Sequence, residues 1–324
     1  MTHLVLNLEQ TPIRRTGHKN YVLLDSADIS LSAGASYYHG AVLDTQGIVA
    51  SYTWKGLAPA QGVYTFTNPV KTLNYAQSYG KSVILRFFYK NYAGVPELRL
   101  PDYITSDHIT YGGSVGHGGL RPNAIGGYTP RFDHPQLMAH FKDMITALAA
   151  EIADHPALQG VGFDESAWSF ANTWGTGETV GLTAAQVRAA HREMSLHLQS
   201  CFPGKEIYPF YNYCDGSTAT QVLDELRWSW TQGMLASITD THRYTDMSHA
   251  FQPVMPAYPI NGVKTIMCVD HMSTGNNDSG VTERMLENAR TTALRGADIT
   301  AWYIRGGASS AWWTAVKNAI AIIG

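Results

Sequence analysis

Two adjacent carboxylates at the end of a short apolar run carry the clearest chemical signal in the chain. Residues 160–163 read Gly-Val-Gly-Phe, the pattern of a buried strand, and Asp164 and Glu165 follow at once, with Trp168 close behind. In barrels of alternating strands and helices, catalytic residues lie where the strands end at one face. Two acids beside an aromatic ring there would suit general acid and base catalysis on a sugar. The competing interpretation is structural: Asp164 caps the next segment and Glu165 forms a surface ion pair.

Glu165 is the predicted proton donor of this pair. Apolar neighbours, Trp168 among them, would desolvate its carboxyl and raise its pKa, which suits an acid at neutral pH. Asp164 is a candidate catalytic partner. Asp270, at the end of a later apolar run, is the candidate nucleophile, unless it caps the loop at 273–279.

Further side chains at predicted strand ends could bind a substrate. Arg86, at the end of one strand, would bind a sugar hydroxyl, orient a carboxylate or form a structural ion pair, and Asp240 ends another strand. The chain holds 8 Trp and 18 Tyr, and such rings serve either as platforms for sugars or as core. The aromatic candidates are Trp54, Trp168, Trp174, Tyr211 and Trp302.

The elements that would position these residues alternate between strand and helix about eight times. Apolar runs predict strands at Ala35–His39, Ile48–Trp54, Ser82–Phe88, Val161–Phe163, Glu206–Tyr211, Leu235–Thr239, Val263–Val269 and Ile299–Ile304. Helices are predicted at 69–80 with Asn68 as N-cap, at 133–154 with Asp133 as cap, at 183–200, at 282–295 and from 310 onward. Only residues 40–47 separate the first two strands, which is short for a parallel crossover. Either the first strand begins earlier or this crossover is irregular.

Such alternation predicts an α/β protein built as a single (β/α)8 barrel. Residues 35–324 would form the barrel, and residues 1–34 would be an N-terminal segment packed on it. Residues 91–132, after the third strand, are rich in Gly, Pro and His and predict a long loop. We expect this loop to overhang the cleft, because it leaves the barrel at the face where catalytic residues gather.

Composition narrows the classes of partner. The formal net charge is −3, without a basic patch or a long run of like charge, which argues against nucleic acid and membrane partners. The first residues show no signal-peptide or transmembrane pattern, which leaves a cytoplasmic or a particle-borne protein as the expectation. The 13 His and 3 Cys match no metal-ligand spacing, so we expect neither metal nor cofactor, and free thiols rather than disulfides.

Three stretches of the chain carry the pattern of a known enzyme family. Trp54, Leu57, Pro59, Gly62, Tyr64 and Phe66 precede a predicted helix and the run Lys81-Ser-Val-Ile-Leu-Arg86. These residues, the stretch 155–165 and Ala301-Trp302-Tyr303 resemble the second and third, fourth and eighth units of the large clan of retaining TIM-barrel glycoside hydrolases, with its β-galactosidase-like and cellulase-like barrels. The resemblance spans about residues 35–310. It implies a TIM barrel that cleaves an oligo- or polysaccharide, with Glu165 as acid/base and Trp302 as the floor under the scissile sugar.

Two departures from that clan keep the mechanism open. The clan usually has Asn before its acid/base Glu, where this chain has Asp164, and a Glu nucleophile at the end of its seventh strand, where this chain has Asp270. An adjacent Asp-Glu pair on the fourth strand instead resembles the substrate-assisted N-acetylhexosaminidases. In those enzymes the Glu is the acid and the Asp orients the acetamido group of the substrate. Retention, inversion and substrate assistance therefore all stay open, as do the sugar and its linkage.

Two readings outside this class also stand. The missing seventh-strand Glu is compatible with a catalytically silent carbohydrate-binding barrel. Gly306-Gly307 after the eighth strand would suit a phosphate group in a barrel enzyme that acts on a substrate other than a sugar.

Overall fold

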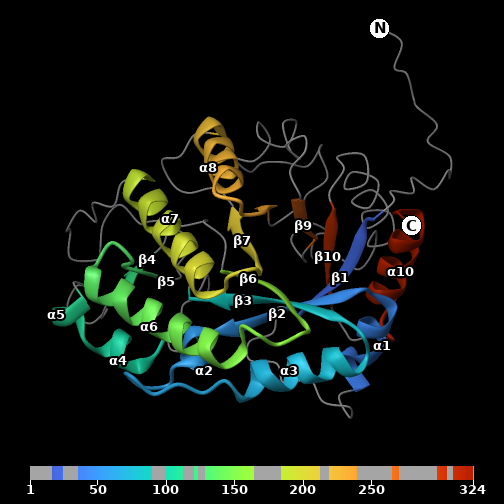
Figure 1. Ribbon diagram of the computed structural model, residues 1–324, viewed down its shortest axis with the longest axis horizontal. Helices are drawn as coiled ribbons and strands as arrows, with labels where there is room; N and C mark the ends of the chain where they lie inside the picture. The colour runs from blue at the N-terminus through green and yellow to red at the C-terminus, as the bar shows by residue number, and fades with distance from the viewer. Residues whose placement is uncertain are drawn as a thin grey trace, which may run out of the picture.

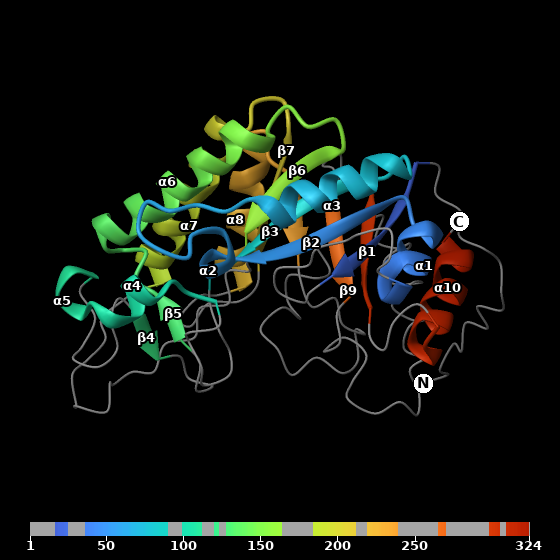
Figure 2. The same ribbon diagram turned by 90° about the horizontal axis from the view of Figure 1, so that it is seen from below.

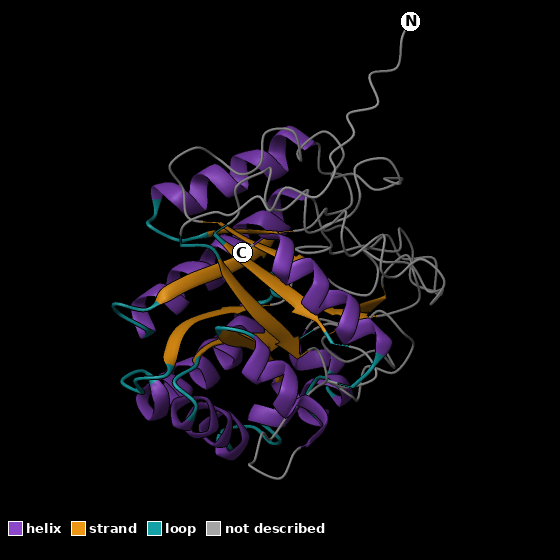
Figure 3. Cartoon of the chain, turned by 90° about the vertical axis from the view of Figure 1, so that its right-hand side faces the viewer, coloured by secondary structure: helices purple, strands orange, loops and turns teal. Residues whose placement is uncertain are grey.

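Eight parallel strands close into a barrel in the computed structural model (Figures 1 and 3). The structure describes residues 17–24, 36–89, 99–111, 120–122, 128–163, 184–211, 219–238, 265–269, 298–304 and 309–323. The barrel strands are β1 (Lys19–Leu24), β2 (Gly47–Thr53), β3 (Ser82–Phe88), β6 (Leu158–Phe163), β7 (Glu206–Tyr211), β8 (Ala236–Ile238), β9 (Thr265–Val269) and β10 (Ile299–Tyr303). Their order around the wall is β1-β10-β9-β8-β7-β6-β3-β2.

The first strand of the wall lies earlier than predicted. β1 pairs with β10 on one side, from Lys19 opposite Ile299, and with β2 on the other, from Tyr21 opposite Gly47. Residues 19–24 therefore belong to the barrel, and their assignment to an N-terminal segment ending at residue 34 is wrong. The predicted strand at 35–39 is also wrong, because helix α1 (Ser36–Asp44) occupies this stretch. The short spacing before β2 had pointed to an earlier first strand, and that alternative is confirmed.

The other seven predicted strands are confirmed, with ends that shift by at most three residues. Between consecutive strands, on the outside of the barrel, lie α2 (Trp54–Leu57), α3 (Thr67–Ser78), α6 (Pro135–Ile152), α7 (Ala184–Cys201) and α8 (Ala219–Thr231). α10 (Ala311–Ile323) follows the last strand, β10. The predicted helix at 282–295 lies outside the described residues. α1 and α10 lie side by side (Figures 1 and 2), and the Trp313 Nε1–H of α10 donates to Asp44 Oδ2 at 2.9 Å. α10 is thus hydrogen-bonded to α1, the helix between β1 and β2.

Both predicted N-caps are wrong. α3 begins at Thr67 after Phe66, so Asn68 lies inside its first turn. α6 begins after His134, and Asp133 instead pairs with Arg131 at 2.7 Å. Both helices start within two residues of the prediction because the position of a Pro in the first turn is a stronger signal than the choice of cap.

The stretch predicted as a long loop after the third strand contains short regular elements. α4 (Asp102–Ser106), α5 (His108–Tyr111) and a hairpin of β4 (Leu120–Pro122) with β5 (Tyr128–Pro130) lie within it. α4 is tied to α2 by the Lys55–Asp102 ion pair at 2.7 Å. The Lys55 N–H also donates to the carbonyl oxygen of Arg99, just before α4, at 3.0 Å. These contacts join the two segments that follow the ends of β2 and β3 (Figure 2).

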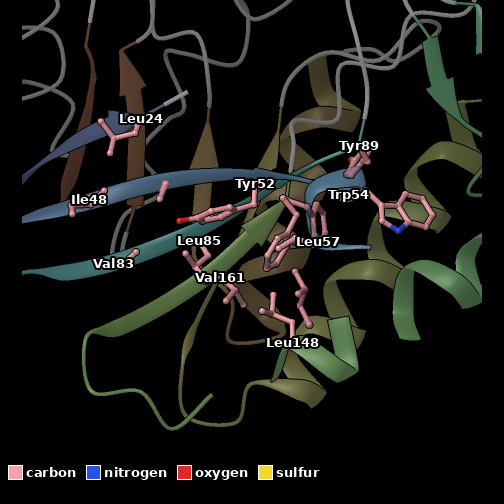
Figure 4. Packing of buried hydrophobic residues seen from close by; sticks show 14 of the residues in the cluster. Leu24, Ile48, Tyr52, Trp54, Leu57, Val83, Leu85, Tyr89, Leu148 and Val161 are labelled. Carbon is pink, nitrogen blue, oxygen red and sulfur yellow. The ribbon is translucent and has the colours of Figure 1, made fainter. Parts of the chain in front are cut away.

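In β1, β2, β3, β6, β7 and β10, alternate residues face outward and pack under the helices. Outward side chains of β1, β2, β3 and β6, among them Ile48, Leu85 and Val161, join apolar residues of α3 and α6 in one core cluster (Figure 4). In α6 the buried positions recur every three or four residues, as one face of an amphipathic helix requires. Burial of this face stabilises each helix far more than its intrinsic propensity does.

The other set of alternate residues fills the barrel. Tyr21, Leu23, Val49, Ile84, Tyr208, Phe210, Ile299 and Ala301 form a second, interior cluster. Glycines leave room for the large rings: a Cβ at Gly47 would lie 2.5 Å from the Tyr21 ring, and one at Gly160 would lie 2.6 Å from the Tyr208 ring and 2.3 Å from a backbone oxygen. The interior is therefore packed, as in other eight-stranded barrels.

At the end of the barrel where the strands begin, this interior is polar. The Gln159 Oε1 accepts from the hydroxyls of Tyr21 and Ser82, and the Gln159 amide donates to Glu206 Oε2 at 2.6 Å. Tyr208 also donates to Glu206. Burial raises the pKa of Tyr21, and it raises the pKa of Tyr208 well above its usual range, with the Glu206 charge acting in the same direction on both. We call these five residues the lower network.

Candidate active site

The carboxyl ends of the strands define the candidate active site. β6 ends at Phe163, β8 at Ile238 and β9 at Val269, so the predicted acids Asp164, Asp240 and Asp270 follow these ends by one or two positions in sequence. Asp164, Glu165, Trp168, Trp174, Asp240 and Asp270 themselves lie outside the described residues. Around the wall, β7 and β8 separate β6 from β9 on one side, and four strands separate them on the other. The fourth and seventh strands are thus not neighbours in the wall, and the expectation that Glu165 and Asp270 face each other across the mouth stays a prediction.

Arg86 faces into the barrel near this end. It is opposite Ser51 of β2 and Gly162 of β6 in the strand register. Its guanidinium carbon lies 4.5 Å from the ring centroid of Phe88 and 5.2 Å from that of Phe210. Phe210 belongs to β7, so the Arg86 side chain reaches past β6 to the next strand.

Gly162 makes this reach possible. Any Cβ at this position would lie 3.1 Å from the Phe210 ring and 2.3 Å from a backbone oxygen of β7. The glycine therefore leaves the inner face of β6 bare beside the guanidinium. Arg86 is only 7% exposed. Its positive charge lies against the faces of aromatic rings, beside β6, the strand that Asp164 and Glu165 follow in sequence.

A second arginine lies on the same aromatic ring. The guanidinium carbon of Arg99, in the segment after β3, is 4.7 Å from the Phe88 ring centroid. Phe88 is the last residue of β3 and is 3% exposed, whereas Arg99 is partly exposed. The order Arg86, Phe88, Arg99 thus runs from the barrel interior toward its mouth. We call this group the arginine–phenylalanine stack.

Three predicted aromatic platforms are core residues instead. Trp54 is fully buried, stacked on Phe132 at 5.9 Å and edge-on to Phe141 at 5.2 Å. Figure 4 shows it within the buried apolar residues. A ring without an exposed face cannot stack on a sugar, so the assignment of Trp54 as a platform is wrong.

Trp302 and Tyr211 lie on the outward face of their strands. Trp302 is fully buried in the outer core cluster and donates from Nε1 to Asn20 Oδ1 at 2.9 Å. Tyr211 accepts a hydrogen bond from Ser229 of α8 at 3.2 Å, and burial raises the pKa of its hydroxyl. Both predictions are wrong because side chains alternate between faces along a strand. Their neighbours Tyr303 and Phe210 occupy the inward positions.

Sequence reasoning did not find Phe88, Phe210 or Arg99. Strand alternation would indicate the first two. Phe88 stands two residues after the inward-facing Arg86 in β3, and Phe210 stands two residues after the inward-facing Tyr208 in β7. No pattern marked Arg99, because its place beside Phe88 depends on tertiary packing.

No group of three or more His, Cys, Asp or Glu side chains that could hold a metal ion lies in the described part of the chain. None of the helices described is both long enough and apolar enough to cross a membrane.

The fold is shared with solved structures of carbohydrate-active enzymes. The β-galactosidase of Marinomonas ef1 superposes with a TM-score of 0.58 at 13% identity, over 89% of this chain and 54% of the enzyme. Xylanase 10B of Thermotoga petrophila RKU-1, solved with xylobiose, gives 0.55 at 13% identity over 89% and 82%. An endogalactoceramidase gives 0.56 at 14% identity over 94% and 74%. This chain has the TIM-barrel-like fold of glycoside hydrolases.

That likeness is one of structure alone. No family profile matches the sequence, and no curated protein sequence matches it. The chain spans about half the length of the β-galactosidase. Identities of 13–14% show a common fold, and the chemistry of this chain has to be argued from its own residues.

Proposed function

We propose that the chain is a glycoside hydrolase that cleaves glycosidic bonds of an oligo- or polysaccharide at the mouth of a (β/α)8 barrel. The observation that carries the proposal is the position of β6. It is the fourth strand of a closed parallel barrel, it ends at Phe163, and the sequence continues directly with Asp164 and Glu165. Barrel enzymes place their catalytic groups at strand ends of this kind.

The fold comparisons support the sugar class. The similar structures include xylanases solved with xylobiose and xylopentaose and an endogalactoceramidase. In the proposed reaction Glu165 protonates the glycosidic oxygen as the bond breaks, which requires a carboxyl that stays protonated near neutral pH. Asp270, which follows β9, is the proposed second carboxylate, and Asp240 a weaker substrate contact.

Arg86 supplies a buried positive charge to this proposed arrangement. In the strand register Arg86 stands opposite Gly162, two residues before Asp164, and its buried guanidinium lies over the Phe210 ring. A fixed cation stabilises a nearby carboxylate in its ionised form. We therefore assign Arg86 the role of keeping one strand-end acid charged, so that the neighbouring Glu165 is the group that carries the proton.

The distance between the carboxyls decides the stereochemical course. A retaining enzyme has its two carboxyls about 5–5.5 Å apart, and an inverting enzyme about 6.5–9.5 Å apart. Asp at position 270 is one methylene shorter than a Glu, which favours the wider spacing. We place direct catalysis by Glu165 and Asp270 ahead of the alternative, a substrate-assisted N-acetylhexosaminidase that uses the adjacent Asp164–Glu165 pair.

The test is turnover of a panel of chromogenic glycosides by the wild-type chain and by Glu165→Gln. We expect Glu165→Gln to lose turnover of substrates with poor leaving groups by at least about 100-fold, the usual contribution of general acid catalysis, with an unchanged melting temperature. Glu151→Gln, on the outer surface of α6, is the matched control and should keep full activity.

Three other results would change the conclusion. Full activity of Glu165→Gln would remove Glu165 from the mechanism. Activity confined to 2-acetamido sugars, with inhibition by a thiazoline, would favour the substrate-assisted route. Binding of glycans by the wild type without any turnover would identify a carbohydrate-binding barrel.

A further inference from the structure

A group of four half-buried rings lies on the outer side of the barrel, where α4 and α6 meet the segment between α2 and α3 (Figures 1 and 2). In that segment the Tyr64 and Phe66 rings stack, with centroids 6.0 Å apart and planes 9° from parallel. Tyr103 of α4 meets His140 of α6 edge-on, with centroids 5.7 Å apart. We call these four residues the aromatic ledge.

Polar side chains lie directly beside the aromatic ledge. Gln61 Nε2 is 3.4 Å from His140 Nε2, and Asp143 follows His140 by three residues, on the same side of α6. Burial raises the pKa of Tyr64 and of Tyr103, and the charge of Asp143 acts in the same direction on both. The exposed carboxylate of Asp143 therefore lies near both tyrosines, and the ledge combines ring faces with hydrogen-bonding groups.

The rings of the aromatic ledge are held in place by their neighbours. Tyr111 is 2% exposed, and its ring centroid lies 6.4 Å from that of Tyr103 and 5.7 Å from that of His140. The Lys55–Asp102 ion pair fixes α4, which carries Tyr103, to α2. Side chains that are already fixed lose little conformational entropy when a ligand binds, so these rings are prepared for a flat ligand.

The charge beside the aromatic ledge limits the class of ligand. The lysines of α2 and α6 are both paired, Lys55 with Asp102 and Lys142 with Glu193. Asp143, by contrast, is exposed and places a negative charge next to the rings. Because like charges repel, a nucleic acid or an acidic glycan is disfavoured at this surface.

The arrangement of the rings also disfavours a cationic ligand. An aromatic cage for a quaternary ammonium group places several ring faces around one point. In the aromatic ledge two rings lie parallel to each other and the other two meet edge-on. This arrangement is unlike a cage and suits an extended ligand that crosses several rings.

We propose that the aromatic ledge binds a neutral glycan chain on the outer side of the barrel. The apolar C–H faces of sugar rings stack on Tyr64 and Phe66, as flat apolar groups do on aromatic faces. Sugar hydroxyls donate to the carboxylate of Asp143 and exchange hydrogen bonds with the amide of Gln61. The inference goes beyond the proposed function, because binding at the ledge uses none of the strand-end acids.

The experiment measures binding by native gel electrophoresis of the full chain carrying Glu165→Gln, so that the glycan stays intact. Each gel contains one soluble neutral polysaccharide: a mixed-linkage β-glucan, an arabinoxylan or a galactomannan. We expect at least one of them to retard the chain. Adding the double change Tyr64→Ala/Phe66→Ala should weaken this binding at least about tenfold, the effect expected for the loss of two stacking rings.

Matched variants assign the binding to the aromatic ledge. Trp230→Ala removes a ring of α8 that is 47% exposed and should leave the affinity within about twofold of the parent's. Tyr64→Phe keeps the stacking face and should retain most of the affinity. Asp143→Asn keeps an accepting oxygen without the charge and should change the affinity by less than about threefold. A melting temperature within about 2 °C of the parent shows that a variant is folded.

Several outcomes would overturn the inference. They are retardation by none of the three polysaccharides, equal retardation of the double variant and its parent, and loss of binding in Trp230→Ala. Tighter binding of an acidic polysaccharide would also overturn it, as would binding of tetramethylammonium that Asp143→Asn abolishes.

Failure of the proposed function is seen separately, with small chromogenic glycosides and the chain that retains Glu165. Turnover of these glycosides, together with unchanged polysaccharide binding in the double variant, would keep the hydrolase and remove the glycan site at the ledge. Polysaccharide binding that depends on Tyr64 and Phe66, without turnover of any glycoside, would do the reverse.

Discussion

The two ends of the barrel interior are built from different chemistry. Where the strands begin, the lower network joins Tyr21, Ser82, Gln159, Glu206 and Tyr208 by mutual hydrogen bonds. Where they end, Arg86 and Arg99 lie against Phe88, and Arg86 also against Phe210. The lower end satisfies its polar groups with one another, and at the upper end two guanidiniums lie against aromatic faces.

This difference matches the division of labour between the faces of such barrels. Groups that satisfy one another close the barrel and stabilise it, since buried polar groups are costly when left without partners. A guanidinium on a ring carries several donors in one plane, which suits a ligand with acceptor oxygens. We therefore expect changes at the lower end to affect stability alone and changes at the upper end to affect function as well.

The largest expected effect comes from filling the glycine gaps on β6. A Cβ at Gly160 or Gly162 would lie 2.3 Å from a backbone oxygen of β7. Gly160→Ala and Gly162→Ala should each lower the free energy of unfolding by about 3 kcal/mol, because the strands must separate to admit the methyl group. Urea unfolding measures this loss.

Gly62→Ala measures the effect of backbone conformation without the effect of steric overlap. Gly62 has φ +69°, and no atom lies within 4 Å of the place that a methyl group would take there. This variant should therefore lose only about 1 kcal/mol from backbone strain. Equal losses of unfolding free energy in Gly62→Ala and Gly160→Ala would show that the close approach of β6 and β7 does not require a glycine at position 160.

Arg86 tests the upper end. Arg86→Met keeps the apolar part of the side chain and removes the charge, and we expect kcat/KM to fall about 10- to 100-fold, equivalent to about 1.4–2.7 kcal/mol. The acidic limb of the pH profile should move to higher pH, because a carboxylate that loses a neighbouring cation has a raised pKa. Arg86→Lys should restore most of the profile. A fall in stability without a shift of the limb would make Arg86 a structural residue.

Tyr208 tests the lower end. Tyr208→Phe removes a donor to Glu206 and should cost about 1–2 kcal/mol of stability, with kcat/KM unchanged. The raised pKa of Tyr208 gives a second readout. The unfolded chain loses its tyrosine protons from about pH 10 while the folded chain holds them, so stability is complete below that pH and falls as pH rises above it. Tyr208→Phe should flatten this alkaline loss, and an unchanged slope would contradict the assignment.

The smallest effect is expected outside the barrel, at His197 of α7. Burial lowers the pKa of His197, and its Nε2 lies 3.0 Å from the Lys142 carbonyl oxygen of α6. Because the unfolded chain takes up the proton first, stability is complete above about pH 6.5 and falls as pH drops through the lower folded pKa. Unfolding midpoints at about pH 7.5 and 5 should therefore differ less in His197→Gln, by well under ~1 kcal/mol for a partly exposed group. A difference equal to that of the parent would exclude His197 as a source of acid sensitivity.

The sequence indicated the strands well because most are short apolar runs between turn residues. Ser82–Phe88 and Glu206–Tyr211 were predicted to the residue. The first strand was not assigned to the barrel because the apolar run within Lys19–Leu24 is short, and the apolar content of 36–44 fits a helix as readily as a strand. α8 was missed altogether, although its residues 222 and 226 are buried at helical spacing.

The candidate residues were predicted less well than the elements that carry them. Arg86 was placed correctly at an inner strand end, whereas Trp302 and Tyr211 belong to confirmed strands but face outward. A strand pattern with apolar residues on both faces does not show which face is inside, since both are buried in a barrel wall. The orientation depends on how the ring of strands closes.

By itself the sequence determined the number and order of most elements, because hydrophobic periodicity and helix-ending residues act locally. It also determined that two acids follow the fourth strand of the barrel. Only the tertiary structure decided that β1 closes the wall, that Gly162 opens a path for Arg86 to reach Phe210, and that Arg99 meets the ring of Phe88. These features join residues 11 to 280 positions apart, and contacts at such separations are fixed by how the whole chain packs.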